Sequence, residues 1–295
     1  MGEREGAVAG TLLITGAAGQ LGQALVQEAG RQGWEVTATD AHNLDITDPQ
    51  AVWGDLSRQR PEVVINAAAA TRVDDLESDP DGALRVNALG PRNLAVACRR
   101  LGIKLIHLST DYVFDGAKAG PYVEWDATGP LSVYGRSKLL GEEWVRQQCP
   151  DHFIVRTAWL YGVPGPNFVT AILARGRDLA PDGELKVVSD QRGTPTSTLA
   201  LAPQLLALAG TEAFGTYHAT CQGETTWYEF AGLILAAAGI EVRVTPCTTA
   251  EFPRPAPRPA NSVLENRLLQ VAGLDRMPAW QAAYRQFWEA YGDRL

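Results

Sequence analysis

The sequence is poor in the features that mark secreted, membrane-spanning and metal-binding proteins. Its 4 cysteines are scattered among 295 residues without a Cys-x-x-Cys pair, which argues against a disulfide framework or a zinc site and indicates a reducing, cytoplasmic environment. No run of about 18 apolar residues is present, so we expect no membrane-spanning helix. The opening segment MGEREGAVAG lacks the apolar core of a signal peptide. The 4 histidines show no metal-ligand spacing, so we expect no metal site.

Positive charge is also in short supply. The formal net charge is −8, with 26 Lys and Arg against 34 Asp and Glu. This argues against non-specific binding to nucleic acid, which requires a basic surface. A local pocket can still oppose the global charge and bind a small anionic ligand. The hydrophobic content of 45% and the charged content of 20% are typical of a globular protein with a sizeable core.

Apolar runs alternate with helical patterns along the first half of the chain. We expect strands over residues 11–15, 34–39, 62–67, 105–108 and 153–158. We expect helices over 20–31, 81–101 and 132–148, with a kink or a break at Pro91. The alternation predicts βαβ units and a parallel sheet, and the continuous apolar character of the strands predicts that helices cover both faces.

The pattern changes in the second half of the chain. Helices are expected over 168–175, 197–209 and 226–238, and strands over 185–189, 215–219 and 241–245. We interpret the proline-rich segment 253–259 as a rigid loop, with a polyproline II ligand for a partner domain as the alternative. The predicted fold class is α/β. A Rossmann-type, doubly wound parallel sheet covers residues 11–165 with a return segment near 195–220, and a smaller C-terminal α/β substrate domain covers mainly 166–295.

A glycine-rich turn, TGAAGQLG, links the first expected strand to the first expected helix. Its glycines are Gly16, Gly19 and Gly22, and they stand where a dinucleotide-binding turn requires them. The first allows a tight turn, the second admits a pyrophosphate, and the third lets the helix lie close to the sheet. The helix N-terminus then offers free N–H groups to the phosphates. Asp40 ends the second strand, where a carboxylate can bind an adenosine ribose and repel a 2′-phosphate, which favours NADH and leaves NADPH open.

Tyr134 and Lys138 are four residues apart in an expected helix, so they lie on one face. Lysine is scarce, with 4 in the chain, and chance would place one at this spacing from a tyrosine roughly 0.1 times. The ordinary pKa of tyrosine is about 10, and a neighbouring ammonium group favours the phenolate. The pair therefore predicts a proton donor for a carbonyl oxygen whose carbon receives hydride.

Seven segments occur in an order that resembles a known family. They are TGAAGQLG, NAAAATRVD, VNALGPRNLA, STDYVFDG, YGRSKLLGE, RTAWLYG and RPANSVLENRLL. Together they resemble the dTDP-4-dehydrorhamnose reductases, a family of the extended short-chain dehydrogenase/reductase superfamily, over residues 11–291. The glycine turn and the YxxxK pattern specify only the superfamily, whereas STDYVFDG and RPxNS are more specific.

The resemblance implies a role for each member of a set of residues. Thr110, Tyr134 and Lys138 would form the catalytic triad, with Tyr134 and Lys138 also contacting the cofactor. The other expected cofactor contacts are Gly16, Gly19, Gln20, Leu21, Gly22, Asp40, Asp45, Ile46, Ala67, Ala68 and Ala69. The expected substrate contacts are Thr110, Asp111, Trp159, Arg258 and Asn261, the last two facing the nucleotide diphosphate.

The implied reaction is reduction of the C4 keto group of dTDP-4-dehydro-L-rhamnose to dTDP-L-rhamnose by NADH or NADPH. The implied partner is a dTDP-4-keto-6-deoxy sugar, and the resemblance allows a homodimer. Two alternatives stay open: another nucleotide-sugar epimerase or reductase, and a non-catalytic regulatory subunit resembling that of methionine adenosyltransferase. A 4,6-dehydratase is disfavoured, because that reaction needs Asp-Glu after the threonine and here Asp111 is followed by Tyr112.

Overall fold

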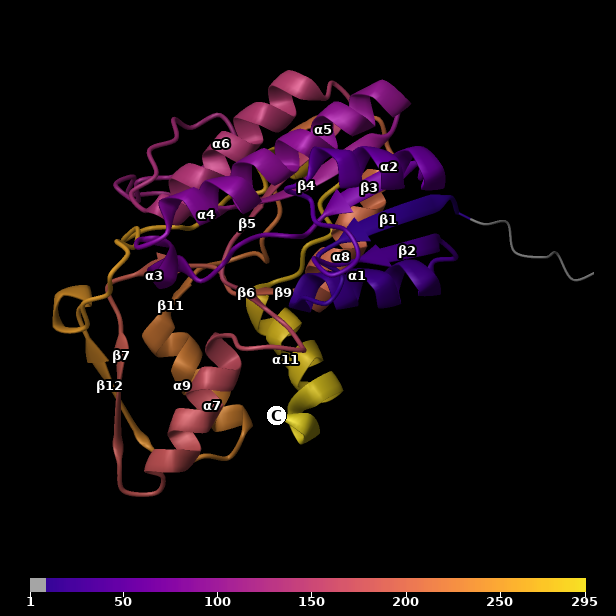
Figure 1. The fold of residues 1–295 in the computed structure, drawn as a ribbon. Helices are drawn as coiled ribbons and strands as arrows, with labels where there is room; N and C mark the ends of the chain where they lie inside the picture. Colours follow the sequence, from indigo (N-terminus) through magenta and orange to yellow (C-terminus); the bar gives the residue numbers. More distant parts are fainter. Residues whose placement is uncertain (1–8) are drawn as a thin grey trace, which may run out of the picture.

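Six parallel strands form the central sheet of the chain, whose computed structural model describes residues 9–295. The strands are β1 (Thr11–Thr15), β2 (Glu35–Thr39), β3 (Val63–Asn66), β4 (Lys104–Thr110), β5 (His152–Thr157) and β10 (Gly215–His218). Their order in space is β10-β5-β4-β3-β1-β2 (Figure 1). The chain order reverses between β1 and β3, and sheets of this kind bind ligands at such a point. The expectation about a signal peptide concerns residues that lie mostly outside the described part.

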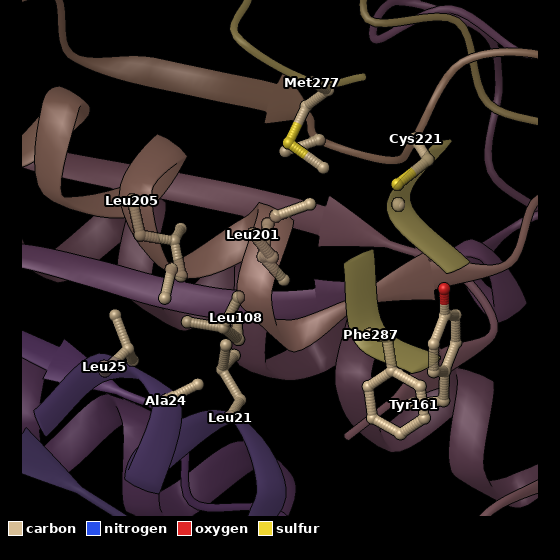
Figure 2. Packing of buried hydrophobic residues seen from close by; sticks show 14 of the residues in the cluster. Leu21, Ala24, Leu25, Leu108, Tyr161, Leu201, Leu205, Cys221, Met277 and Phe287 are labelled. Carbon is tan, nitrogen blue, oxygen red and sulfur yellow. The ribbon is translucent and has the colours of Figure 1, made fainter. Parts of the chain in front are cut away.

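Helices cover both faces of this sheet (Figure 1). One face carries α1 (Gln20–Arg31) and α8 (Thr198–Ala209), and the other carries α2 (Pro49–Gln59), α5 (Gly90–Leu101) and α6 (Val133–Gln148). Within β1, Leu12 and Ile14 belong to the first core and Leu13 belongs to the second. Figure 2 shows Leu108 of β4 between Leu21 of α1 and Leu201 of α8 in the first core. This two-sided burial confirms the predicted doubly wound α/β class.

A smaller lobe stands beside the sheet (Figure 1). Its elements are α7 (Phe168–Leu179), β7 (Glu184–Val188), α9 (Trp227–Ala237) and β12 (Arg243–Cys247), and β7 pairs with β12 in parallel. Short strands join the lobe to the sheet layer: β6 (Leu160–Tyr161) pairs with β9 (Thr196–Ser197), and β8 (Arg192–Gly193) pairs with β11 (Thr225–Thr226). The last helices are α10 (Arg267–Val271) and α11 (Trp280–Tyr291). The division into two domains stays a prediction.

The sequence expectations did not include α3 (Val73–Leu76), α10 or α11. Two further helical regions also differ from them. Helix α2 was not expected, although Asp48 caps it by accepting hydrogen bonds from the backbone N–H groups two and three residues on. The helix expected over 81–101 is divided into α4 (Pro80–Leu84), a π-helical turn (Arg85–Leu89) and α5. Pro91 lies in the first turn of α5, where its missing N–H is tolerated, so it does not cause the break.

The π-helical turn presents Asn87 to two other segments. Its Oδ1 accepts a hydrogen bond from the N–H of Ala70 at 2.8 Å, and its Nδ2 donates to the carbonyl oxygen of Ala70 at 3.0 Å. The same Nδ2 donates to Oγ of Ser137 in α6 at 3.0 Å. The turn therefore fixes the segment that follows β3 to α6, and π turns are often found at functional sites.

A buried ion pair fixes α6 to the sheet. Glu142 of α6 is 0% exposed, and it accepts hydrogen bonds from Nε and Nη2 of Arg156 in β5 at 2.9 and 2.7 Å. Oγ of Ser109 in β4 donates to the same carboxylate at 2.5 Å. The carboxylate is thus satisfied from two adjacent strands, as a charge in a dry interior requires.

Gly141 lets α6 approach the π-helical turn, because a Cβ there would overlap the carbonyl oxygen of Asn87. We expect Gly141→Ala to lower the free energy of unfolding by about 1–3 kcal/mol, since the two backbones must move apart. The matched control is Gly30→Ala in α1, where a Cβ meets nothing within 4 Å. It is expected to raise the free energy of unfolding by about 0.4–1 kcal/mol. Urea denaturation of both variants checks this, and equal midpoints would contradict it.

Candidate active site

The glycine-rich turn after β1 uses each of its three glycines differently. Gly16 has a φ of 68°, and a Cβ there would lie 2.7 Å from the backbone nitrogen of Ala68. A Cβ on Gly22 would overlap the carbonyl oxygen of Gly16, so this glycine seats α1 against the turn. Gly19 is the N-cap of α1, and a Cβ there would meet only that carbonyl oxygen, at 3.2 Å. The space beside Gly19 is therefore open to a ligand.

This turn forms one wall of a cavity of about 590 Å³ at the carboxyl ends of the central strands. The other walls come from the segment after β3, the end of β4, the start of α6, the segments around β6, and the first residue of α9. Twelve of the predicted site residues line the cavity: Gly16, Gly19, Gln20, Leu21, Gly22, Ala67, Ala69, Thr110, Asp111, Tyr134, Lys138 and Trp159.

Four of the predicted cofactor contacts do not line this cavity. Asp40 and Asp45 each accept a hydrogen bond from the backbone N–H two residues on, at 2.8 and 2.9 Å, and so shape turns beyond the end of β2. Ile46 is buried, and its side chain lies where a Cβ on Gly90 would be. The backbone of Ala68 lies against Gly16 of the glycine turn. Their cofactor roles stay predictions.

The two residues predicted to face the diphosphate also lie outside the cavity. Arg258 makes a bidentate ion pair with Asp74, with Nη1–Oδ1 at 2.5 Å and Nη2–Oδ2 at 3.1 Å. Asn261 uses Nδ2 to donate to the carbonyl oxygens of Lys118 and Gly120, at 2.7 and 2.9 Å. Asn261 therefore anchors the loop before it, and Arg258 is held at the edge of the site by an internal carboxylate.

Tyr134 and Lys138 face the cavity from the first turns of α6. Lys138 is buried, and its Nζ donates to the carbonyl oxygen of Leu108 at 2.6 Å. Burial lowers the pKa of Lys138 to about 8, although the nearby carboxylate of Glu142 acts in the opposite direction. Burial raises the pKa of Tyr134 to about 12, although a hydrogen bond with Thr110 opposes the rise. The expectation that Lys138 lowers this pKa was wrong, because burial of the phenol dominates. At neutral pH, Tyr134 therefore keeps its proton and Lys138 keeps its charge.

The end of β4 brings Thr110 and Asp111 to the same cavity. Oγ1 of Thr110 donates to Oδ1 of Asp111 at 2.9 Å. Burial raises the pKa of Asp111 to about 6, although nearby Ser262 and the hydrogen bond from Thr110 act to lower it. Oδ2 of Asp111 is buried without a hydrogen-bond partner in the part of the chain that the structure describes. A buried acceptor of this kind suits a hydroxyl group of a ligand.

Gln20 ties the glycine turn to the loop beyond β6. Its Nε2 donates to the carbonyl oxygen of Pro166 at 3.0 Å, and its Oε1 accepts from Nδ2 of Asn167 at 3.3 Å. Asn167 caps α7 of the smaller lobe. A side chain predicted to contact the cofactor thus also joins the sheet layer to the lobe.

Trp159 and Trp227 form a stacked pair in the cavity wall. Their ring centroids lie 3.4 Å apart and their planes differ by 7°. Trp159 follows β5 with a φ of 46°, a strained conformation for a bulky side chain. Its Nε1 donates to Oγ of Ser262 at 3.1 Å, and a Cβ on Gly193 would overlap its ring. Several contacts therefore hold Trp159 in one orientation.

Three residues that shape the site were not predicted: Asn87, Glu142 and Trp227. The sequence could have indicated Glu142, because it lies four residues after Lys138 on the same helix face. Arg156 places a charge in an otherwise apolar strand, so a buried acidic partner could have been expected. Asn87 and Trp227 carried no such signal, since their partners are distant in the sequence.

Residues 10–292 match the protein family described as "RmlD substrate binding domain". The chain belongs to this family. A Streptomyces griseus relative named dTDP-4-dehydrorhamnose reductase is 46% identical over 285 residues, which cover 94% of this chain and 93% of that protein. These findings confirm the resemblance drawn from the seven sequence segments.

Solved structures of RmlD-like proteins have the same fold. The crystal structure of a dTDP-4-dehydrorhamnose reductase from Clostridium acetobutylicum has a TM-score of 0.93 and 45% identity, and the match covers 96% of this chain and 99% of that chain. The reductase from Bacillus anthracis, solved in complex with NADP, has a TM-score of 0.92 and 38% identity, with 95% and 99% of the two chains covered.

The tryptophan pair gives a spectroscopic test of the site geometry. Indoles stacked face to face couple electronically, so circular dichroism in the indole absorption region is expected to show two bands of opposite sign. Trp227→Phe is expected to abolish these bands because it removes one partner. Trp144→Phe is the control, since that ring packs against Arg92 away from the cavity. Bands that survive in Trp227→Phe would assign them to other tryptophans, of which the chain has 8 in all, and would contradict the expected coupling of this pair.

Proposed function

We propose that this chain transfers hydride from NADH or NADPH to C4 of dTDP-4-dehydro-L-rhamnose and so forms dTDP-L-rhamnose. One observation carries the proposal: Tyr134, Lys138 and Thr110 converge in the cavity that the glycine turn opens into. Membership of the RmlD family and the names of its relatives support the same reaction.

The residues of the glycine turn fit a nicotinamide dinucleotide. The N–H groups at the start of α1 would bind the pyrophosphate, and Gly19 leaves room for it. Ala67 and Ala69 would line the cofactor after β3. When bound, the cofactor supplies the hydride. NADH and NADPH both remain candidates, since Asp40 favours the former and the Bacillus anthracis relative was solved with NADP.

The proton for the product hydroxyl would come from Tyr134. Because its pKa is about 12, Tyr134 is protonated at neutral pH and can donate to the alkoxide that forms at O4. Thr110 would donate a hydrogen bond to the same oxygen. The charge of Lys138 would stabilise the phenolate left on Tyr134. These groups act on charge that develops only during the reaction, which is where stabilisation raises the rate.

The exact sugar is the open part of this proposal. A relative from Streptomyces niveus that is 42% identical over 276 residues is named dTDP-4-keto-6-deoxy-D-glucose reductase. The test mixes the purified chain with dTDP-4-dehydro-L-rhamnose or with dTDP-4-keto-6-deoxy-D-glucose and follows the absorbance of NADH and of NADPH. Sugar-dependent oxidation with dTDP-4-dehydro-L-rhamnose as the better substrate is expected. Binding of cofactor without oxidation would favour the non-catalytic regulatory subunit instead.

Assembly and location belong to the proposal as well. The acidic net charge supports the absence of a nucleic-acid partner, and a homodimer and a cytoplasmic location follow from the resemblance and the cysteine pattern. No helix within residues 9–295 is both long and apolar enough to cross a membrane. Within the same residues, no three His, Cys, Asp or Glu side chains gather as a metal site would require.

Tyr134→Phe removes the assigned proton donor. Turnover is expected to fall by about 10²-fold or more, because the hydroxyl that protonates the reacting oxygen is gone, and cofactor affinity is expected to be retained, because the ring stays in place. Tyr112→Phe is the matched control, since its ring contacts Tyr134 at a centroid distance of 5.6 Å in the same cavity. Its turnover is expected to fall by less than about tenfold. Near-normal turnover in Tyr134→Phe would rule out this donor.

The pH dependence is expected to report Lys138. Its charge is lost as the pH rises through about 8, whereas Tyr134 with a pKa of about 12 keeps its proton. The value of kcat/KM is therefore expected to decline above that pH with a single ionisation. Lys138→Arg keeps its charge to much higher pH and is expected to move the decline upward, whatever its absolute rate. An unmoved decline would assign it to another group.

A further inference from the structure

The cavity is short of positive charge for the substrate class proposed above. Of the described residues that line it, Lys138 is the one cation, and its Nζ is turned to the carbonyl oxygen of Leu108 beside the catalytic tyrosine. A nucleoside diphosphate carries its charge at the other end of the molecule from the reacting sugar carbon. Proteins recognise such groups with arginine side chains and backbone N–H groups.

Two arginines and one N–H group are found at the edge of the cavity, gathered on one carboxylate. Arg258 makes its bidentate pair with Asp74, and Nη1 of Arg254 lies 3.8 Å from Oδ2 of the same side chain. The N–H of Ala256 donates to Oδ1 of Asp74 at 3.2 Å. These three donors make a set that also fits a phosphate, and here the internal carboxylate fills it.

The position of this donor set connects it to the cavity. Asp74 directly follows Val73, which lines the cavity. Arg258 lies beside Tyr112, a second lining residue, whose ring packs edge-on against Tyr134. An anion bound by Arg258 would therefore lie next to the site where the sugar is to be reduced.

The loop that presents the donors is held by contacts that do not involve Asp74. Gly116 has a φ of 76°, and a Cβ there would lie 2.6 Å from the side chain of Pro259, so the loop packs directly on this turn. Asn261 anchors the next part of the loop through its two bonds to backbone carbonyls. Removal of the Asp74 charge is therefore expected to free the arginines without releasing the loop.

The resemblance already implies that Arg258 faces the nucleotide diphosphate. We propose in addition that Asp74, held by Arg254, Arg258 and the N–H of Ala256, is the resident counter-ion of this site and is displaced when the nucleotide binds. The inference rests on the proposed function, because it takes the diphosphate from the proposed substrate. Asp74 neutralises both arginines and holds Arg258 in one orientation, and it competes with the ligand for them. Nucleotide affinity thus depends on how readily the diphosphate replaces the carboxylate of Asp74 on the two arginines.

Calorimetric titration of the full chain with dTDP, thymidine and inorganic pyrophosphate tests the exchange without any turnover. Asp74→Asn is expected to bind dTDP and pyrophosphate about fivefold more tightly or better, because the competing charge is gone, and to bind thymidine as before. Asp75→Asn is the matched control. It removes an equal charge from the next residue, which is 67% exposed at its side chain, and is expected to change dTDP affinity by less than about twofold.

The opposite result separates an anchor from a counter-ion. If Asp74 only holds the loop, Asp74→Asn binds dTDP as weakly as the unmodified chain or more weakly, and the proposal is overturned. Arg258→Gln supplies a second test: it is expected to weaken dTDP at least tenfold and to spare thymidine, and unchanged dTDP affinity would place the diphosphate elsewhere. An unmodified chain that binds pyrophosphate but not dTDP would overturn the proposed function and leave the anion site standing.

Discussion

The buried ion pair between Glu142 and Arg156 is the constraint on which the site depends. It joins α6, which carries Tyr134 and Lys138, to β5, and through Ser109 it also joins α6 to the strand that ends in Thr110. Such a pair adds little net stability, because both charges must be desolvated, but removal of one partner commonly costs about 3–5 kcal/mol. Here the pair fixes the position of α6 relative to β4. The three catalytic groups come from these two elements, and the carboxylate of Glu142 holds the elements together.

Much of the sheet could be predicted because local signals agreed with the final fold. In the turn after β1, Gly16 and Gly22 stand at points of close approach and Gly19 leaves open space, so strand, turn and helix were all evident from a short stretch. The break in the helix over 81–101 could not be predicted, since Asn87 finds its partners in Ala70 and Ser137, which are distant in the sequence. Helix α2 had its cap in Asp48, and that signal was overlooked.

The site also contains residues that the sequence predicted and residues that it did not. Helical spacing alone placed Tyr134 and Lys138 on one face, and the structure brings both to the cavity. Trp227 could not be predicted in this way, because its stacking partner, Trp159, lies on a distant segment of the chain. The bond between Arg258 and Asp74 likewise joins segments from opposite ends of the protein. Sequence patterns report neighbours along one element, whereas this site is assembled by contacts between elements.

Strand β10 completes the central sheet late in translation. It begins at Gly215, whereas its neighbour β5 ends at Thr157, and the first part of the smaller lobe is made between them. During translation the edge of β5 therefore waits unpaired until the ribosome has released the chain beyond His218. Exposed strand edges pair readily with other chains. The nascent protein therefore exposes this edge while the first part of its lobe is being made, and a fragment cut after β5 would keep the edge exposed.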